Sequence, residues 1–298
     1  MRLISLALLC LLLSACGNQT TTTSATDTAT SGEASVATVD KLGAVLAAQP
    51  AQAQARYAYR NPKQTLEFFG IKPGMTVVEV LPGAGWYTKI LLPYLGDTGH
   101  VLGLNYATSL WPNFSFANDE YLARMATWTD TWPAGAQAWR DADSATVSAA
   151  VFGAIPADQR GSADAVLFFR ALHNMARFDS EPFLKNAIQD AYELLKPGGI
   201  AGIVQHEARA DTSDAWADGS AGYLKRDFVI SQMEAAGFTF LGASDVNQNL
   251  ADQPTSDEVV WRLPPSLSGA KDNPEQKAAM LAVGESNRMT LKFAKPAQ

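Results

Sequence analysis

Short apolar runs alternate with segments of helical spacing along most of the chain. The runs that are rich in β-branched or aromatic residues and end at glycine, proline or polar residues predict strands. They are residues 75–81, 100–105, 145–152, 165–169, 200–206, 238–246 and 289–294. Helical spacing predicts helices over 41–59, which Pro50 interrupts, and over 62–69, 86–95, 181–195 and 225–236. This alternation predicts an α/β fold with a mainly parallel sheet and helices on both faces.

Two segments do not follow the alternation. Residues 107–150 contain four tryptophans before the strand that ends them, and residues 247–287 are rich in proline and aspartate. We interpret the second segment as an insertion before the last strand. Most of the tryptophans are expected in the core, because clustered aromatic residues are more often core than pocket. A lid or an apolar acceptor site is the alternative for Trp111, Trp128, Trp132 and Trp139.

The N-terminal residues have the features of a targeting segment. A basic residue precedes an apolar run over 3–13, which is too short for a stop-transfer helix. Leu13-Ser14-Ala15-Cys16 resembles a lipobox, which implies cleavage before Cys16 and lipidation of that cysteine. The alternative is a plain signal peptide with an accidental cysteine. Gly17 follows, and similarity to lipoprotein sorting signals implies an outer-membrane protein that faces the periplasm.

The expected organisation therefore has three parts. Residues 1–15 are the signal peptide, residues 16–40 are the lipidated cysteine and a disordered tether of Thr, Ser and Ala, and residues 41–298 are the globular domain. Cleavage would remove Cys10, so no internal disulfide and no cysteine-rich metal site are expected. The net charge of −7 argues against a nucleic-acid-binding protein. The oligomeric state stays open.

A glycine-rich turn joins the first predicted strand to the next helix. Glu79 lies near the end of the strand, and Pro82, Gly83 and Gly85 lie in the turn. Glycines let a backbone turn sharply and approach a ligand, and the free N–H groups of the next helix point at that ligand. Asn105 ends the second strand at the interval where a residue meets a ribose. A tight connection without a ligand is the alternative.

Around this turn the chain resembles the class I S-adenosylmethionine (SAM)-dependent methyltransferases. Residues 79–86 are similar to their first motif, residues 99–105 to the second, 163–175 to the fourth-strand segment and 194–199 to the turn into the fifth strand. A Pro-Gly-x-Gly-Trp-Tyr-Thr turn at 82–88 and a Gly-Glu-Ser-x-Arg-Met-Thr-Leu segment at 284–291 resemble a group of predicted methyltransferases among exported bacterial proteins. The resemblance covers about residues 57–296.

The resemblance implies a Rossmann-like sheet with an antiparallel last strand and SAM as cofactor. It assigns cofactor binding to Glu79, Pro82, Gly83, Gly85 and Asn105. The chain departs from the family pattern at three places. Leu81 replaces the first glycine, Asn105 replaces an acid, and no acid follows the third strand at 152–155. The altered ribose and adenine contacts predict a weak SAM site, or a site for another ligand.

Histidine and arginine supply the candidates for chemistry. His173 follows the fourth strand and His206 ends the fifth, both at the carboxyl edge where ligands bind in open α/β sheets. His173 is the candidate for catalysis or acceptor contact, with helix capping as the alternative. Arg170 is expected to hold the methionine carboxylate or an acid on the substrate, with a surface ion pair to Asp164 or Asp179 as the alternative. His100 starts the second strand and is expected to be structural.

The remaining candidates are less specific. Tyr57, Arg60 and Trp86 are expected at the cofactor mouth. His173, His206 and Glu207 match no usual metal signature, so no metal is predicted. The sequence favours a SAM-dependent methyltransferase acting on a small molecule or an envelope component. A non-catalytic ligand-binding lipoprotein that retains the methyltransferase fold is the alternative, since export separates the domain from the compartment where SAM is made.

Overall fold

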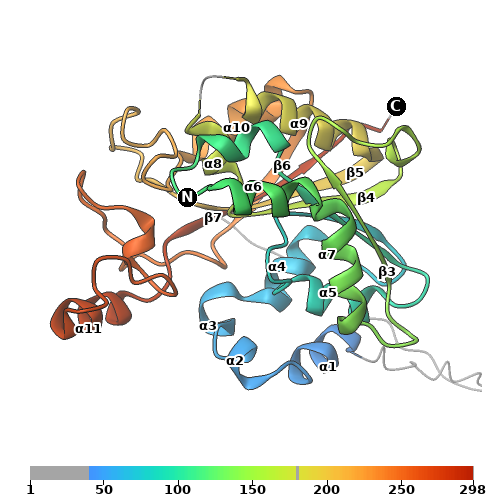
Figure 1. Cartoon of the computed structure of the whole chain (residues 1–298), viewed down its shortest axis with the longest axis horizontal. Helices are drawn as coiled ribbons and strands as arrows, with labels where there is room; N and C mark the ends of the chain where they lie inside the picture. The colour runs from blue at the N-terminus through green and yellow to red at the C-terminus, as the bar shows by residue number, and fades with distance from the viewer. Residues whose placement is uncertain (1–39, 179–180, 298) are drawn as a thin grey trace, which may run out of the picture. The chain divides into compact units, whose positions relative to one another are not determined.

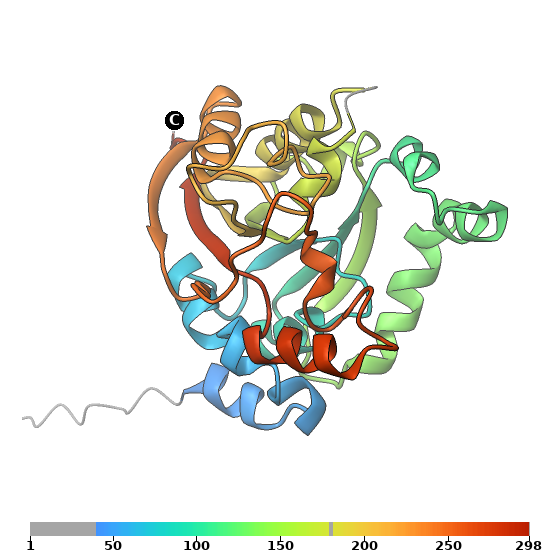
Figure 2. The ribbon, with the colours of Figure 1, turned by 90° about the vertical axis from the view of Figure 1, so that its left-hand side faces the viewer.

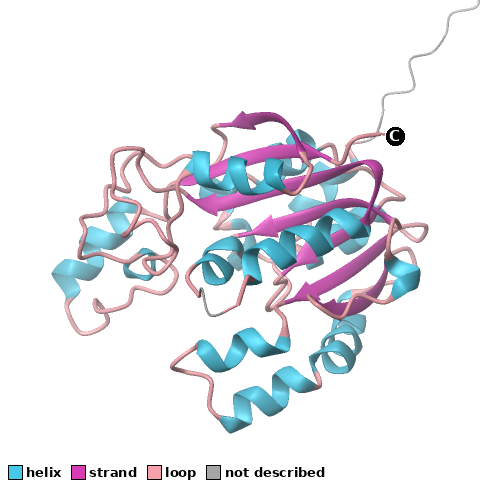
Figure 3. Cartoon of the chain, turned by 90° about the horizontal axis from the view of Figure 1, so that it is seen from above, coloured by secondary structure: helices cyan, strands magenta, loops and turns pink. Residues whose placement is uncertain are grey.

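Seven strands form one sheet in the order β3-β2-β1-β4-β5-β7-β6 (Figures 1 and 3). The computed structural model describes residues 40–178 and 181–297. The predicted signal peptide, Cys16 and the tether up to residue 39 lie outside these residues, and Asp40, the last residue of the predicted tether, is the N-cap of α1. The strands are β1 (Thr76–Val80), β2 (His100–Asn105), β3 (Thr146–Val151), β4 (Ala163–Phe169), β5 (Leu195–His206), β6 (Thr239–Ser244) and β7 (Arg288–Ala294).

Helices cover both faces of this sheet. The α-helices are α1 (Lys41–Ala47), α2 (Ala51–Gln54), α3 (Tyr57–Arg60), α4 (Pro62–Phe69), α5 (Thr88–Leu95), α6 (Asp119–Ala126), α7 (Trp128–Ala136), α8 (Leu172–Ala176), α9 (Phe183–Leu194), α10 (Arg226–Ala235) and α11 (Pro274–Val283). One buried apolar cluster joins α8, α9 and α10 to the sheet, and a second joins α1, α4 and α5 to the other face (Figure 1). Among the described residues, no helix is long and apolar enough to span a bilayer.

The sheet agrees with the predicted Rossmann-like architecture. β1, β2, β3, β4 and β5 pair in parallel, and β7 runs antiparallel to both β5 and β6. The antiparallel last strand is therefore confirmed. Strand order reverses between β1 and β4, because the chain first adds strands on one side of β1 and then on the other. In open α/β sheets, ligands bind at the carboxyl ends of strands beside such a reversal.

Two predicted elements differ from the structure. The helix predicted over 41–59 is three short helices, because Pro50 stops α1 and starts α2 as its N-cap. The turn predicted at 194–199 starts at the last residue of α9 and otherwise lies inside the bounds of β5, where the pairing with β4 changes register. Gly198 has a φ of 76°, which glycine adopts without strain, so the chain bends there without leaving the sheet.

The segment from 247 to 287 projects from one end of the sheet. It carries α11 and the short 3₁₀ turn η4 (Val260–Arg262), and it faces the viewer in Figure 2. The buried side chain of Asp252 holds this segment in place. The buried carboxylate accepts hydrogen bonds from Tyr223 (2.9 Å), from Arg262 (2.7 Å) and from the backbone N–H of Asn287 (2.9 Å). The predicted insertion is thus an ordered wall beside the carboxyl edge of the sheet.

Candidate functional site

The strand ends at the reversal point have an unusual backbone. Leu81 follows β1 with a φ of 54°, and Arg170 follows β4 with a φ of 59°. A bulky residue with positive φ is rare, and such strain of about 1–3 kcal/mol gathers at functional sites. Backbone bonds hold both residues, since Leu81 N–H donates to Leu104 O and Arg170 N–H donates to Val204 O. Both side chains therefore extend into the space above the sheet edge.

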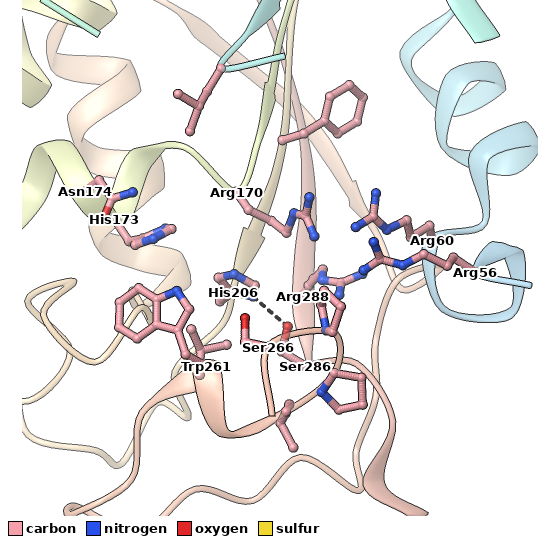
Figure 4. A pocket seen from close by; sticks show the side chains of 16 residues that line it. Arg56, Arg60, Arg170, His173, Asn174, His206, Trp261, Ser266, Ser286 and Arg288 are labelled. Atoms are coloured by element: carbon pink, nitrogen blue, oxygen red, sulfur yellow. Dashed lines mark hydrogen bonds between the residues drawn. The ribbon is translucent and has the colours of Figure 1, made fainter. Parts of the chain in front are cut away.

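That space contains a cationic cavity of about 380 Å³. Its walls come from the turn after β1, the ends of β4 and β5, α8, the residues before β7, and the loop around η4 (Figure 4). Four arginines line it, and we call them the arginine cage: Arg56, Arg60, Arg170 and Arg288. No acidic residue is among the described residues that line this cavity.

One buried carboxylate, on Glu285, partly balances the arginine cage. Glu285 pairs with Arg56 at 2.5 Å, with Arg60 at 3.5 Å and with Arg288. Burial alone would raise the pKa of Glu285, but these three guanidinium groups lower it to about 2. Burial and the neighbouring arginines lower the pKa of Arg60 to about 10, so it stays charged at neutral pH. The cage therefore carries three positive charges in excess of its carboxylate.

Arg170 has no acidic partner in the described part of the chain. Asp164, one of its two predicted partners, instead accepts from Lys196 at 2.5 Å, and Asp179 lies outside the described residues. Burial, with Arg60 and Arg288 nearby, holds the pKa of Arg170 well below its usual value. The guanidinium points into the cavity toward Arg60 (Figure 4). Its charge is the least compensated in the cage.

The two predicted histidines face the same cavity. The rings of His173 and His206 lie 5.5 Å apart between centroids. Burial lowers the pKa of His173 to about 4, although its contact with Gln205 opposes the shift. His206 Nδ1 lies 2.6 Å from Ser286 Oγ, and burial followed by the charge on His173 holds its pKa well below the usual value. Both rings are neutral at neutral pH.

A second cavity, of about 760 Å³, adjoins the first. It shares Leu81, Asn174 and Trp261 with the cationic cavity. Aromatic side chains from the segment after β2 dominate its walls, and they are Tyr106, Trp111, Phe114, Phe116 and Tyr121. Arg177 is the charged residue among its described lining. We call it the aromatic cavity.

The predicted cofactor turn lies beside these cavities. Glu79 is buried and accepts a hydrogen bond from Thr88 Oγ1 at 2.6 Å, and burial raises its pKa to about 7. Pro82 is buried and its carbonyl accepts from Gly85 N–H at 2.9 Å. Gly83 has a φ of 55°, is exposed, and has open space where a Cβ would point. Of these residues, only Gly83 offers a free surface.

Other contacts occupy the remaining predicted cofactor residues. A Cβ on Gly85 would overlap the ring of Trp139, so this glycine allows close packing. Trp132 Nε1 donates to the carbonyl of Gly83 at 3.2 Å. Asn105 is buried, and its Oδ1 accepts from the N–H of Tyr106 at 2.9 Å. Neither Asn105 nor Gly85 lines either cavity.

The aromatic residues divide between core and cavity. Trp111, Trp128 and Trp132 are buried, as predicted for most of the cluster, and Trp111 also lines the aromatic cavity. Of the three residues predicted at the cofactor mouth, Arg60 lines the cationic cavity. Trp86 packs edge-to-face on Tyr57 at 6.0 Å and lies under the Arg60 guanidinium at 4.5 Å. They support the cage from outside.

His100 lies at the amino end of β2, as predicted for a structural residue. Its ring nitrogens lie 2.8 Å from Thr146 Oγ1 and from Ser148 Oγ on β3. In the described part of the chain, no group of three or more His, Cys, Asp or Glu side chains is placed to hold a metal ion. The absence of a metal remains a prediction.

The arginine cage could not be found from the sequence. Arg56, Arg170, Glu285 and Arg288 come from segments that are far apart in the chain, with no common spacing. Trp261 belongs to the segment 247–287, which the sequence indicated as an insertion and nothing more. One feature of the sequence pointed to part of the site. Glu285, Ser286 and Arg288 lie close together in the segment at 284–291 that resembles predicted methyltransferases.

Comparison with known proteins gives similarity in structure only. No family model matches the chain, and no curated protein does. Among solved structures, a SAM-dependent methyltransferase from Aquifex aeolicus is 16% identical, with 83% of this chain and 98% of that chain covered and a TM-score of 0.47. An arsenic(III) SAM methyltransferase from Chlamydomonas reinhardtii is 15% identical, with 86% and 73% covered and a TM-score of 0.42.

A third structure is a didemethyltoxoflavin N1-methyltransferase from Burkholderia thailandensis with bound S-adenosylhomocysteine (SAH). It is 12% identical, with 82% of this chain and 80% of that chain covered and a TM-score of 0.44. At these identities, likeness concerns the arrangement of strands and helices and not the chemistry. The order and directions of its own seven strands give the chain the Rossmann-like α/β sheet that its resemblance to class I methyltransferases predicted.

Proposed function

We propose that the protein is a SAM-dependent methyltransferase with a small-molecule acceptor. The observation that carries the proposal is the meeting of two cavities at Leu81, directly after the first strand and beside the exposed Gly83. One cavity is aromatic and suits a nucleoside. The other is cationic and suits a carboxylate. SAM has a nucleoside at one end and a carboxylate at the other.

The residues present fit such a cofactor in part. The open side of Gly83 admits a ligand close to the backbone. Tyr106 and Trp111 would stack against the adenine, and the methionine carboxylate would reach the edge of the cationic cavity beside Leu81, which both cavities share. Glu79 would act by holding the turn through Thr88. Asn105 would turn toward the ribose only after giving up its bond to Tyr106.

The side chains of the cationic cavity would align the acceptor. When bound, SAM supplies an electrophilic methyl group to the acceptor and leaves as SAH. Alignment of donor and acceptor is the main demand of such a displacement. His173 is neutral and can accept a proton from an acceptor hydroxyl, but a pKa of about 4 makes it a weak base. Its position favours a role in orienting the acceptor.

Gly83→Leu tests the cofactor site. The new side chain would enter the open space beside the turn, and we expect SAM and SAH binding to fall by at least tenfold in calorimetric titrations. Gly198→Leu is the matched control, because Gly198 also has a positive φ of 76° and open space, but lies at the opposite end of the sheet. Unchanged SAM binding in Gly83→Leu would refute this assignment of the turn.

A non-catalytic ligand-binding protein is the second candidate. Leu81 places a branched side chain where the methyltransferase pattern has glycine, and Trp132 and Trp139 pack on the turn. Both features reduce the room for a cofactor. No measurable binding of SAM or SAH to folded wild-type protein would favour this candidate.

We also propose that the protein is exported and anchored in the cell envelope through lipid on Cys16, with the domain in the periplasm. The lipobox-like residues 13–16 support this proposal. Two or more acyl chains anchor a protein stably. Cys16→Ser should abolish incorporation of a labelled fatty acid and release the protein from membranes. Labelling of the variant would contradict the assignment.

A further inference from the structure

The arginine cage is built for a ligand that carries more negative charge than SAM. Arg60 and Arg288 are 5% and 3% exposed, and the Nε atoms of both are buried without a hydrogen-bond partner. Arg60 and Arg288 share the one carboxylate of Glu285. Arg170 adds a third guanidinium, and this one has no acidic partner in the described chain. Like charges in a poorly solvated site repel strongly. A bound anion would relieve this repulsion and use the unpartnered donors.

SAM alone cannot supply that charge. Its carboxylate is negative, but its ammonium and sulfonium groups are positive, so SAM carries one net positive charge. Placing it against three excess positive charges leaves the cavity further from neutrality. SAH lacks the sulfonium charge and is net neutral. The cage therefore disfavours SAM relative to SAH unless a second, anionic molecule is present.

We propose that the methyl acceptor is a small anion with two or more acidic groups, bound in the cationic cavity by Arg170, Arg60 and Arg288. The assignment of this anion as the acceptor rests on the proposed methyltransferase function. The assignment of its charge rests on the cavity alone. Arg170 binds one acid through its paired N–H donors, and the guanidinium groups of Arg60 and Arg288 bind the second.

The surroundings limit the ligand in size and shape. The cavity of about 380 Å³ holds a compact molecule. His206 and Ser286, joined at 2.6 Å, border the cage on one side, and His173 and Trp261 lie beyond His206 on that same side (Figure 4). Neutral histidines and hydroxyls add hydrogen bonds without repelling an anion. Carboxylates and phosphates both fit, since each accepts paired hydrogen bonds from a guanidinium group.

Charge-matched probes test the proposal with the wild-type protein. Acetate, malonate, inorganic phosphate and the neutral malonamide are titrated in a calorimeter, with and without SAH. We expect malonate or phosphate to bind at least tenfold more tightly than acetate, no binding of malonamide, and weaker binding at high salt. Preference for malonate over phosphate identifies a dicarboxylate, and the reverse preference identifies a phosphate. Equal binding of malonate and malonamide would overturn the proposal.

Variants assign the binding to the cage. Arg170→Met should weaken malonate binding at least tenfold, and Arg170→Lys should restore part of it because the charge returns. Arg160→Met is the matched control, since Arg160 is an exposed residue paired with Glu193 away from the cavity. Circular dichroism checks the folding of each variant. Malonate binding that survives in folded Arg170→Met would overturn the assignment.

SAM binding separates this proposal from the methyltransferase function. With saturating malonate, we expect SAM to bind at least tenfold more tightly and SAH to change less. Competition between malonate and SAM would overturn the acceptor assignment, because the cage would then be the site of the cofactor carboxylate. Malonate binding without SAM binding would refute the methyltransferase function but keep the anion site. SAM binding without any anion binding would keep the methyltransferase function and refute the anion site.

Discussion

The side chain of Leu81 limits the space that a ligand can occupy in both cavities. It adopts a φ of 54° that glycine accepts freely, and its side chain borders both cavities. The strain is tolerated because the backbone N–H is fixed to β2 through Leu104. Because this conformation directs the Leu81 side chain into the walls of both cavities, the side chain limits the size of the ligand that each can hold.

Leu81→Gly should therefore strengthen SAM binding, by about fivefold or more, because it frees space without disturbing the turn. Leu81→Ala is the control that keeps the backbone strain but shortens the side chain. Calorimetric titration of SAM into the three proteins measures the effect. Equal affinities in all three would show that the Leu81 side chain does not occupy the space of the cofactor.

Glu79 makes stability depend on pH in an unusual direction. Its pKa is about 7 in the folded protein against an ordinary value of 4.5, so between these values the unfolded chain binds fewer protons. Stability is then lost as pH rises from about 4.5 to 7. His173 has the opposite sign, because its folded pKa of about 4 lies below the ordinary 6.5 and it stabilises less as pH falls.

Comparing wild type with Glu79→Gln isolates the first effect, since His173 is present in both. We expect the variant to gain stability relative to wild type as pH rises, by up to about 3 kcal/mol at pH 7.5 compared with pH 4.5. Urea denaturation at several pH values measures the difference. A difference that does not change with pH would mean that Glu79 titrates normally.

At the scale of elements, the wall over the cationic cavity depends on one buried carboxylate. Asp252 joins Tyr223, Arg262 and the backbone before β7. Loss of one partner from a buried charged pair costs about 3–5 kcal/mol, because the other charge stays buried. If this carboxylate is removed, Arg262 keeps one acidic partner in the described chain, Glu258 at 3.1 Å, and its hydrogen bond to Tyr223. The loop that carries Trp261 is thereby tied to the sheet.

Asp252→Asn should lower the free energy of unfolding by about 3 kcal/mol and weaken malonate binding, because Trp261 loses its support. Asp257→Asn, at an exposed position of the same segment, is the control and should change neither. Thermal unfolding and titration give both quantities. A stable Asp252→Asn protein with full malonate affinity would contradict this role for the network.

The sheet could be predicted from sequence because its strands are short apolar runs with clear ends. β1 and β4 are examples, since Thr76–Val80 and Ala163–Phe169 are buried on both faces. The wall and the cage could not be predicted in the same way. Arg170 was identified by its place after β4, but Arg56 and Arg288 join it only because tertiary structure brings α3 and the start of β7 to the same edge.

At the scale of the whole molecule, the sheet depends on β7. This strand pairs with β5 over Ile200 to His206 and is the neighbour of β6 in the sheet. A chain that stops after residue 287 should lose cooperative unfolding and all ligand binding. A chain that stops after Lys295, which keeps β7, should behave as wild type. Cooperative thermal unfolding of the shorter chain would contradict this dependence.

The place of β7 has a consequence for biosynthesis. The strand is translated after every other strand, yet it lies between two that are made earlier. Until the ribosome has released it, β5 and β6 each present an open edge, which invites association with other chains. We therefore expect the nascent protein to be most prone to association in the interval before β7 is available for pairing.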